Sequence, residues 1–541
     1  MKRRRLLVLL AATAVLSLAG CSLPGAQRYG LAVSQDDLVT TTARGQGTVD
    51  HVAWNLPYEP LSLDPAHSFN YSENTVIANM CESLFRLAPD LSIQPGLATG
   101  VQQPDPLTQV YTLRDDVTFW DGTPMTAEDV AYSLNRQLDP KTGSYYSNYY
   151  TDVASIAATG AHQVTVKFTS PDALFQQAMA TAAGAVTEKA FTTKAGEAFG
   201  TPRGGVMCTG PFAFAGWHTG QSIVLDRNPH YWDASLQPHA KKLEFSFIAD
   251  ESTAVNALRS GEVDGQFFFL PPAGLIQLQK NDDLTVDYGR SLAFFALVAL
   301  DQKGPLGDVR VRQALSALID RGAEASVVMQ GAALPTAVLT GPDYWGYDRS
   351  AFASAASAFT TRTDPTRAKQ LLAEAKPTKP IVIGIQGSSA VHEQTANVIQ
   401  AAGKALGLDI RIKVIPVEQY GNLYSDPKAR AGLDAFLTTF YGNVADPLDV
   451  YAVFAAGGPS NYGDYTGVSD AVASARSTID PTQRAQKGID IQKKVQQDAP
   501  WLPPVNLPTI LVQNDRITGA TASMAYLYYP WAAAIGTKGK K

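Results

Sequence analysis

The chain has 541 residues, of which 45% are hydrophobic and 17% charged, and its formal net charge is −6. This length exceeds what one hydrophobic core supports, and a prior of about 150 residues per domain predicts three domains. The weak, dispersed acidity argues against nucleic acid as a partner and favours a soluble body.

The first 21 residues predict export from the cytoplasm. Residues 2–5 are basic, and residues 6–18 form an apolar stretch that is too short to cross a bilayer, which takes about 20 residues. Small residues stand directly before Cys21, a pattern that resembles a bacterial lipobox. We therefore expect Cys21 to be lipidated and to anchor the protein at the outer face of the cell membrane. An ordinary signal peptide with an incidental cysteine is the alternative.

Residues 22–48 are rich in Ser, Gly, Gln, Thr and Ala without apolar periodicity, which predicts a flexible tether. Two cysteines remain after lipidation, Cys81 and Cys208. An even remainder in an oxidising compartment allows a disulfide between them, and two buried thiols are the alternative.

The first half of the folded region starts with clear capping signals. Thr126 and Asp129 have the spacing of a capping box ahead of a helical stretch. Residues 291–300 form an apolar run of strand length, which predicts a buried strand rather than a membrane span. Strand and helix signals alternate on both sides of this run. The fold class is therefore predicted to be α/β.

The second half contains a strand–helix–strand unit. Residues 380–385 form a β-branched run, residues 392–406 read as a helix that ends at Gly407, and residues 409–414 form the next strand. Such a unit predicts a right-handed parallel crossover. Two further helices are expected to begin where an aspartate precedes a proline, at residues 364–365 and 480–481.

The sequence lacks the usual motifs of catalysis and of metal binding. The seven histidines are scattered without the paired spacing of zinc hydrolases, and neither a nucleophile elbow nor a phosphate-cradling glycine loop occurs. Asp446 and Asp449 could act as an acid–base pair, but a helix start with two solvated acids explains them as well. We therefore expect neither an enzyme nor a bound metal or cofactor.

Several sequence blocks carry a family resemblance. They are, in chain order, Leu61–Pro65, Gln94–Ala98, Tyr111–Arg114, Val117–Val130, Thr209–Phe212, Arg227–Trp232, Ser260–Asp264 and Asp308–Arg321. From about residue 50 to 520 the chain resembles the family 5 extracytoplasmic solute-binding proteins of bacterial ABC importers. This family includes dipeptide-, oligopeptide- and nickel-binding proteins.

The resemblance implies a two-lobed binding-protein fold with three domains. Domain I, here lobe I, would comprise residues 49–93, 206–290 and 505–541. Domain II, here the extra domain, would comprise residues 94–205 and belong to lobe I. Domain III, here lobe II, would comprise residues 291–504. The hinge would lie where the chain crosses between lobes, near residues 290–297 and 504–510.

The resemblance also implies which residues face the solute. From lobe I these are Phe69, Asn70 and Tyr71. From the extra domain they are Tyr146 and Tyr149, with Tyr145 beside them. From lobe II they are Phe440, Tyr441, Asn443 and Asp446. For each tyrosine, packing or surface exposure is the competing interpretation.

One departure from the family pattern bears on the solute. Peptide-binding relatives hold the ligand's ammonium with an aspartate, and here Asn443 stands at that position. Asparagine accepts a hydrogen bond without adding charge, and charge-assisted hydrogen bonds are about twice as strong as neutral ones. Either Asp446 or Asp449 supplies the anchor, or the solute lacks a free amine there; a one-residue alignment slip is a further alternative.

The function that the resemblance implies is capture of short peptides and their delivery to ABC permease subunits by a membrane-anchored monomer. A non-peptide solute, such as an oligosaccharide, a metal chelate or haem, is the alternative cargo. A surface sensor or adhesin and a secreted hydrolase on the same fold are the competing classes.

Overall fold

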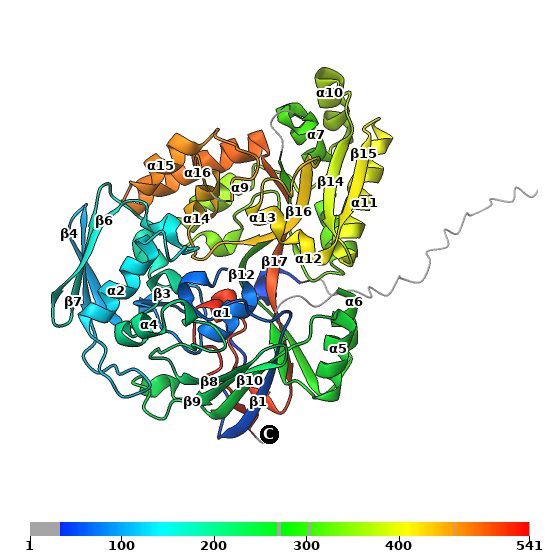
Figure 1. Ribbon diagram of the computed structural model, residues 1–541. Helices are drawn as coiled ribbons and strands as arrows, with labels where there is room; N and C mark the ends of the chain where they lie inside the picture. Colours follow the sequence, from blue (N-terminus) through cyan, green and yellow to red (C-terminus); the bar gives the residue numbers. More distant parts are fainter. Residues whose placement is uncertain (1–32, 268–271, 301–303, 459, 540–541) are drawn as a thin grey trace, which may run out of the picture.

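The structure is a computed structural model that describes residues 33–267, 272–300, 304–458 and 460–539. The names lobe I, lobe II and extra domain are used below for the ranges given above, whose bounds stay a prediction. Figure 1 shows lobe I at the bottom, the extra domain at the left and lobe II at the top and right. None of the helices in the described ranges combines the length and apolar character that crossing a membrane requires.

One eleven-stranded sheet runs through both lobes. Its strands follow the order β15 (Ile410–Ile415), β14 (Ile381–Gln386), β16 (Ala435–Tyr441), β12 (Leu284–Ala299), β17 (Trp501–Asn514), β11 (Gly265–Phe267), β1 (Val49–Leu56), β10 (Ala240–Phe247), β9 (Ser222–Arg227) and β8 (Phe212–His218), and β13 (Leu334–Pro335) pairs with β17. The first three strands belong to lobe II and the last five to lobe I. β12 and β17 connect the two groups.

The two connecting strands are antiparallel to each other and long enough to enter both lobes. The first part of β12, up to Gly289, pairs with the end of β17, and the part from Ala293 onward pairs with its beginning. The register is interrupted between these two parts, where a strand pair bends most easily. The apolar run predicted as a buried strand lies within β12, and its residues 292–298 are buried. The predicted hinge falls on this interruption.

The extra domain is built on a separate antiparallel sheet. Its strand order is β4 (Ala98–Asp105), β5 (Thr108–Leu113), β7 (Gln163–Phe168) and β6 (Val153–Gly160). Helix α2 (Ala127–Leu138) packs on β6 and β7, with α3 (Phe175–Ala178) and α4 (Lys189–Ala195) nearby. The predicted capping box is confirmed, because Thr126 and Asp129 exchange side-chain-to-backbone hydrogen bonds at the start of α2.

Helices cover the sheet of lobe II. They are α7 (Val309–Leu318), α9 (Arg349–Ala356), α10 (Pro365–Ala375), α11 (Ala390–Ala405), α14 (Pro447–Tyr451), α15 (Ser469–Arg476) and α16 (Pro481–Asp498). The predicted strand–helix–strand unit is β14, α11 and β15, and its two strands pair in parallel. Gly407 ends this helix region with a φ of 83°, a backbone conformation that favours glycine. The helix starts predicted at Asp364 and Asp480 are confirmed, since each side chain caps its helix.

Lobe I carries α1 (Tyr71–Ile77), α5 (Glu251–Ser260) and α6 (Pro272–Gln279). Cys81 and Cys208 form a disulfide here, with their Cα atoms 4.9 Å apart. Cys81 follows the end of α1, and Cys208 precedes β8 by four residues. The bridge ties the segment after α1 to the segment that returns from the extra domain to lobe I.

The predicted tether of residues 22–48 is wrong in its second part. Residues 33–48 lie along the body of the protein, and their backbone is hydrogen-bonded to both lobes and to the C-terminal segment. Val33 donates to the carbonyl of Gly331 (3.0 Å) in lobe II, and Val39 exchanges hydrogen bonds with the hinge region of β12. Apolar periodicity missed this segment because backbone hydrogen bonds and only two packed apolar side chains, Val33 and Leu38, attach it. Residues 22–32, like Cys21 and the signal segment, lie outside the described residues.

Candidate functional site

Side chains of the extra domain and of lobe II are hydrogen-bonded to each other where these two parts of the protein meet. We call this contact the seam and define it by residues from each side: Tyr149, Asp172 and Gln177 of the extra domain, and Asn443, Asp446, Asp449 and Arg476 of lobe II. Most of the seam is polar. Of the predicted site residues, Tyr149, Asn443 and Asp446 are part of it.

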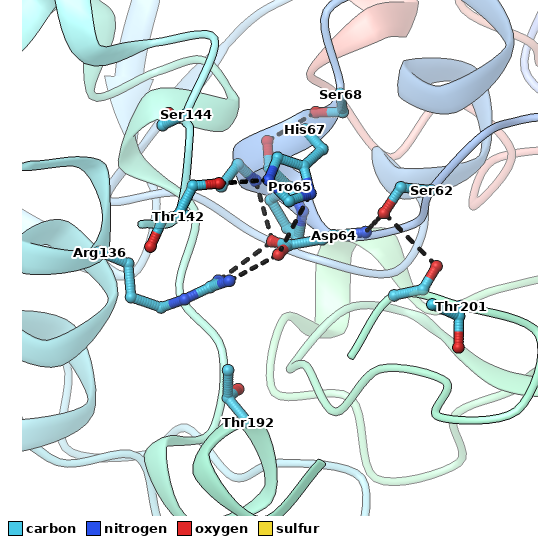
Figure 2. A network of polar contacts seen from close by, with 12 residues as sticks. Ser62, Asp64, Pro65, His67, Ser68, Arg136, Thr142, Ser144, Thr192 and Thr201 are labelled. Carbon is cyan, nitrogen blue, oxygen red and sulfur yellow. Dashed lines mark hydrogen bonds and ion pairs between the residues drawn. The ribbon is translucent and has the colours of Figure 1, made fainter. Parts of the chain in front are cut away.

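A buried ion pair fixes the loop of lobe I that leads to the seam (Figure 2). Both carboxylate oxygens of Asp64 accept hydrogen bonds from Arg136 of α2, at 3.0 and 2.5 Å. His67, three residues further on, contacts the carbonyl oxygen of Thr142 through Nε2 at 2.6 Å. The Asp64 side chain is only 3% exposed, so the pair is shielded from salt and water. The extra domain therefore holds the loop that carries Phe69 and Asn70.

The three predicted residues of lobe I have different surroundings. Asn70 caps α1, because its side-chain oxygen accepts the backbone N–H of Tyr71 at 2.9 Å. The Tyr71 ring is buried 5.0 Å from the ring of Tyr441 in lobe II. Phe69 is 42% exposed and packs against Tyr145 at 4.2 Å, while its carbonyl oxygen accepts the Tyr441 hydroxyl at 2.8 Å. Tyr71, Phe69 and Tyr441 therefore meet where the two lobes touch.

A chain of hydrogen bonds crosses the seam through Asn443. The hydroxyl of Tyr528 in lobe I donates to Asn443 Oδ1 at 2.5 Å, and Asn443 Nδ2 donates to the hydroxyl oxygen of Tyr149 at 2.8 Å. The Tyr149 hydroxyl donates in turn to Asp449 Oδ1. Lobe I, lobe II and the extra domain each contribute to this chain, so it exists only while the lobes are together.

The end of this chain is a buried carboxylate. Asp449 Oδ2 accepts the backbone N–H of Asn443 at 2.5 Å and that of Val444 at 3.4 Å. Burial is the main cause that raises the pKa of Asp449 from its ordinary value to about 6, against the effect of these hydrogen bonds. Burial also raises the pKa of Tyr149 well above its ordinary value, which keeps this phenol protonated and able to donate.

Asp446 is surrounded by partners of its own. It caps α14 by accepting the backbone N–H of Leu448, it accepts Gln177 Nε2 at 2.7 Å, and it faces Arg484 Nε at 3.6 Å. The Tyr347 hydroxyl donates to its other oxygen at 2.9 Å. These contacts surround Asp446 with partners from the protein, and whether it also contacts a solute stays a prediction.

The remaining predicted residues lie close to the seam. Tyr146 is buried and its hydroxyl donates to the carbonyl oxygen of Ser68. Phe440 is half-buried and packs against Trp501 at 5.1 Å and Phe294 at 5.7 Å, inside an aromatic cluster of lobe II. Whether these side chains contact a solute stays a prediction.

Sequence reasoning missed four residues of this region. They fall outside the family blocks and carry no local motif: Tyr528, Asp172, Gln177 and Arg476. Tyr528 reaches Asn443 from a C-terminal segment 85 positions away, and Arg476 reaches the extra domain from the end of α15. Only the tertiary structure brings them to the seam. The described residues include no group of three His, Cys, Asp or Glu side chains arranged to hold a metal ion.

A fold whose two lobes are joined by two strands, with polar groups meeting between the lobes, is typical of proteins that close around a small molecule. Comparison with known proteins agrees with this class. The family described as "Bacterial extracellular solute-binding proteins, family 5 Middle" matches residues 92–462. The chain belongs to this family. It is therefore a solute-binding protein of the kind that serves ABC importers, and not an enzyme.

Individual relatives are similar along most of their length. The periplasmic oligopeptide-binding protein OppA of Escherichia coli K12 is 26% identical over 477 residues, which cover 82% of this chain and 85% of OppA. The structure is similar to Bacillus subtilis AppA in complex with a nonapeptide, with a TM-score of 0.76 at 20% identity, over 92% of this chain and 100% of AppA. It is also similar to AgaA of A. tumefaciens R10 in complex with agropinic acid, with a TM-score of 0.77 at 22% identity, over 91% of this chain and 99% of AgaA.

Proposed function

We propose that this protein is the lipid-anchored, monomeric solute-binding component of an ABC importer, and that it captures short peptides between its lobes. The observation that carries the proposal is the chain of hydrogen bonds from Tyr528 through Asn443 and Tyr149 to Asp449, which joins lobe I, lobe II and the extra domain. A solute that lies among these groups contacts all three parts at once. Peptides are the preferred cargo because the relatives named above include OppA and a nonapeptide complex.

The proposed mechanism of capture depends on a difference in the solute's affinity for the separated and the joined lobes. A solute can shift the equilibrium between separated and joined lobes only as far as it binds one arrangement more tightly than the other. Groups that meet only when the lobes join supply that difference. The joined form would then be the one that permease subunits recognise, and separation of the lobes would release the solute into the permease.

A second cargo class has a specific observation in its favour. Asn443 replaces the aspartate expected at this position, and AgaA, a protein of the same fold, was solved in complex with agropinic acid. A non-peptide solute therefore stands as the second candidate, with an oligosaccharide, a metal chelate or haem as examples. A sensor or adhesin on the same fold would bind a solute without delivering it to a permease.

The cargo can be tested with a defined mixture. Purified protein is incubated with a tryptic digest of casein, separated from unbound material and denatured, and the released molecules are identified by mass spectrometry. We expect short peptides in an amount close to one per chain. Release of no peptide by protein that is folded and free of other solutes would contradict the peptide cargo.

The anchor is tested separately. Cys21 lies outside the described residues, so its lipidation is proposed from the sequence alone. We expect Cys21→Ser to move the protein from the membrane fraction to the soluble fraction. Retention of the variant in membranes would show that another part of the chain holds it there.

A further inference from the structure

We propose that residues 33–39, here called the strap, hold the two lobes in the joined arrangement, and that the contact between Gln35 and Asp343 is the one through which they do so. By favouring joined lobes, the strap raises the affinity for the solute. The proposal goes beyond the function proposed above and rests on it only for the movement of the lobes. Its basis is the position of the strap's contacts relative to the hinge.

The strap is attached to the hinge at its C-terminal end. The backbone N–H of Val39 donates to the carbonyl oxygen of Tyr288 at 2.8 Å, and the carbonyl oxygen of Val39 accepts the N–H of Arg290 at 3.1 Å. These two partners flank Gly289, where the register of β12 against β17 is interrupted. Val39 therefore lies at the point about which the lobes are expected to turn.

The other end of the strap is attached to lobe II. The backbone N–H of Val33 donates to the carbonyl oxygen of Gly331 at 3.0 Å, and Gln35 Nε2 donates to Asp343 Oδ1 at 3.2 Å. A rotation of lobe II about the interruption in β12 displaces these partners relative to Val39. The contacts of the strap therefore differ between joined and separated lobes, which is the condition for shifting the equilibrium between them.

The middle of the strap is a closed turn. Its residues Gln35–Asp37 form a single 3-10 turn, η1. Asp37 Oδ2 accepts the backbone N–H of Ser34 at 2.8 Å and the Ser34 hydroxyl at 2.6 Å. These hydrogen bonds lower the pKa of Asp37, which keeps the acceptor charged at neutral pH. Because the turn fixes the separation of its two ends, a displacement of lobe II breaks contacts instead of extending the strap.

Asp343 connects the strap to the hinge. Its second oxygen, Oδ2, accepts the backbone N–H of Ser291, within the interrupted part of β12, at 3.1 Å. Asp343 is 9% exposed; burial raises its pKa, and Arg290 and Arg349 favour its charged form. A buried carboxylate is destabilised when it loses a donor. Gln35 therefore stabilises the arrangement in which it reaches Asp343.

Apolar packing strengthens the attachment at the same place. Val33 and Leu38 pack against a cluster that contains Ala332 of lobe II together with Leu275 and Leu284 of lobe I. The strap thus covers a junction of the two lobes beside the hinge. Separation of the lobes would expose part of this apolar surface to water, which again favours the joined arrangement.

A strap that only stabilises the fold would behave differently. Its weakening would lower the free energy of unfolding and leave the arrangement of the lobes in the folded protein unchanged. The shape of the folded protein therefore distinguishes the two roles, and melting temperature alone does not.

The first arm of the experiment is small-angle X-ray scattering of the intact protein without solute. Gln35→Ala removes the donor to Asp343 and should reduce the ratio of joined to separated forms about tenfold, seen as a larger radius of gyration. The substitution is made in the wild type and in Arg476→Ala, which lacks a contact across the seam, so that a wholly joined wild type does not hide the effect.

The matched control for this arm is Gln370→Ala. Gln370 Nε2 donates to Glu374 at the same distance of 3.2 Å, but on the exposed surface of α10. This variant should scatter as its parent does. A radius of gyration that Gln35→Ala leaves unchanged in both backgrounds would overturn the proposal, whatever the melting temperature.

The second arm reverses the contact. Gln35→Glu places two carboxylates together and should enlarge the particle. Adding Asp343→Asn lets the new amide donate to the new carboxylate, while its oxygen still accepts the N–H of Ser291. The radius of gyration should then return toward that of the wild type. A double variant as large as Gln35→Glu alone would show that this contact does not hold the lobes.

The third arm connects the strap to the solute. At equal and limiting amounts of the casein digest, Gln35→Ala should retain about tenfold less peptide than the wild type, because fewer molecules are in the joined arrangement. Equal retention would contradict the effect of the strap on affinity. If the wild type retains no peptide, the peptide cargo fails, and the scattering arms still decide whether the strap holds the lobes.

Discussion

Arg476 offers the sharpest test of how the extra domain and lobe II hold together. From the end of α15 it donates to Asp172 at 2.6 Å and to the carbonyl oxygens of Asn148 and Tyr149 at 3.1 Å, and it faces Asp152 at 3.6 Å. It thereby connects lobe II to the backbone that carries Tyr149. We expect Arg476→Ala to shift the protein toward separated lobes.

The magnitude follows from burial. The side chains of Arg476 and Asp172 are 15% and 0% exposed, so removal of the arginine leaves a buried carboxylate uncompensated while the lobes are joined. Breaking such a pair costs about 3–5 kcal/mol. Once the lobes separate, water can solvate Asp172, so the cost falls on the joined form alone. The ratio of joined to separated forms should therefore fall by roughly two to four powers of ten.

The assay is small-angle X-ray scattering of the purified protein, with the radius of gyration as the readout. Arg476→Ala should scatter as a larger particle than the wild type, and adding Asp172→Ala should recover part of the difference. Arg411→Ala is the matched control, because Arg411 and its partner Asp409 are 64% and 55% exposed, so water and salt screen their attraction. Scattering curves of Arg476→Ala and the wild type that superimpose would refute the reasoning.

Three further predictions concern stability. Replacing Cys81 and Cys208 by alanine should lower the free energy of unfolding by about 5 kcal/mol in the chain-entropy model, and the denatured, unreduced wild type should show no free thiol from this pair. Burial raises the pKa of Glu324 from 4.5 to about 7, so its contribution to stability is full below about pH 4.5 and is lost as pH rises through 7; Glu324→Gln should remove this pH dependence from denaturation curves. Deletion of residues 33–48 should lower the melting temperature, because this segment makes backbone hydrogen bonds to both lobes and to the C-terminal segment.

Local sequence signals correctly predicted helix starts and ends that depend on neighbouring residues alone. The capping box at Thr126, the Asp-Pro helix starts and the glycine after α11 depend on contacts within a few residues, and all are present. Short-range physics was therefore sufficient for these elements.

The site was predicted less completely because its contacts are long-range. Asn443 and Tyr149 were named from the family pattern, but nothing local could reveal that Tyr528 would meet them or that Asp446 would already be paired with Arg484. Residues 33–48 were misread for a related reason, since backbone pairing with distant segments leaves no trace in composition. Burial and pairing of charges are properties of the tertiary structure, and local sequence patterns do not predict them.

The most direct test of solute binding is native mass spectrometry of the protein purified from its own host, before and after denaturation. We expect one small molecule per chain, which is released chemically unchanged on denaturation and binds again when it is returned to the protein. A solute that the protein converts into another compound, or host-purified protein that neither carries nor takes up any small molecule from host extract, would contradict this function.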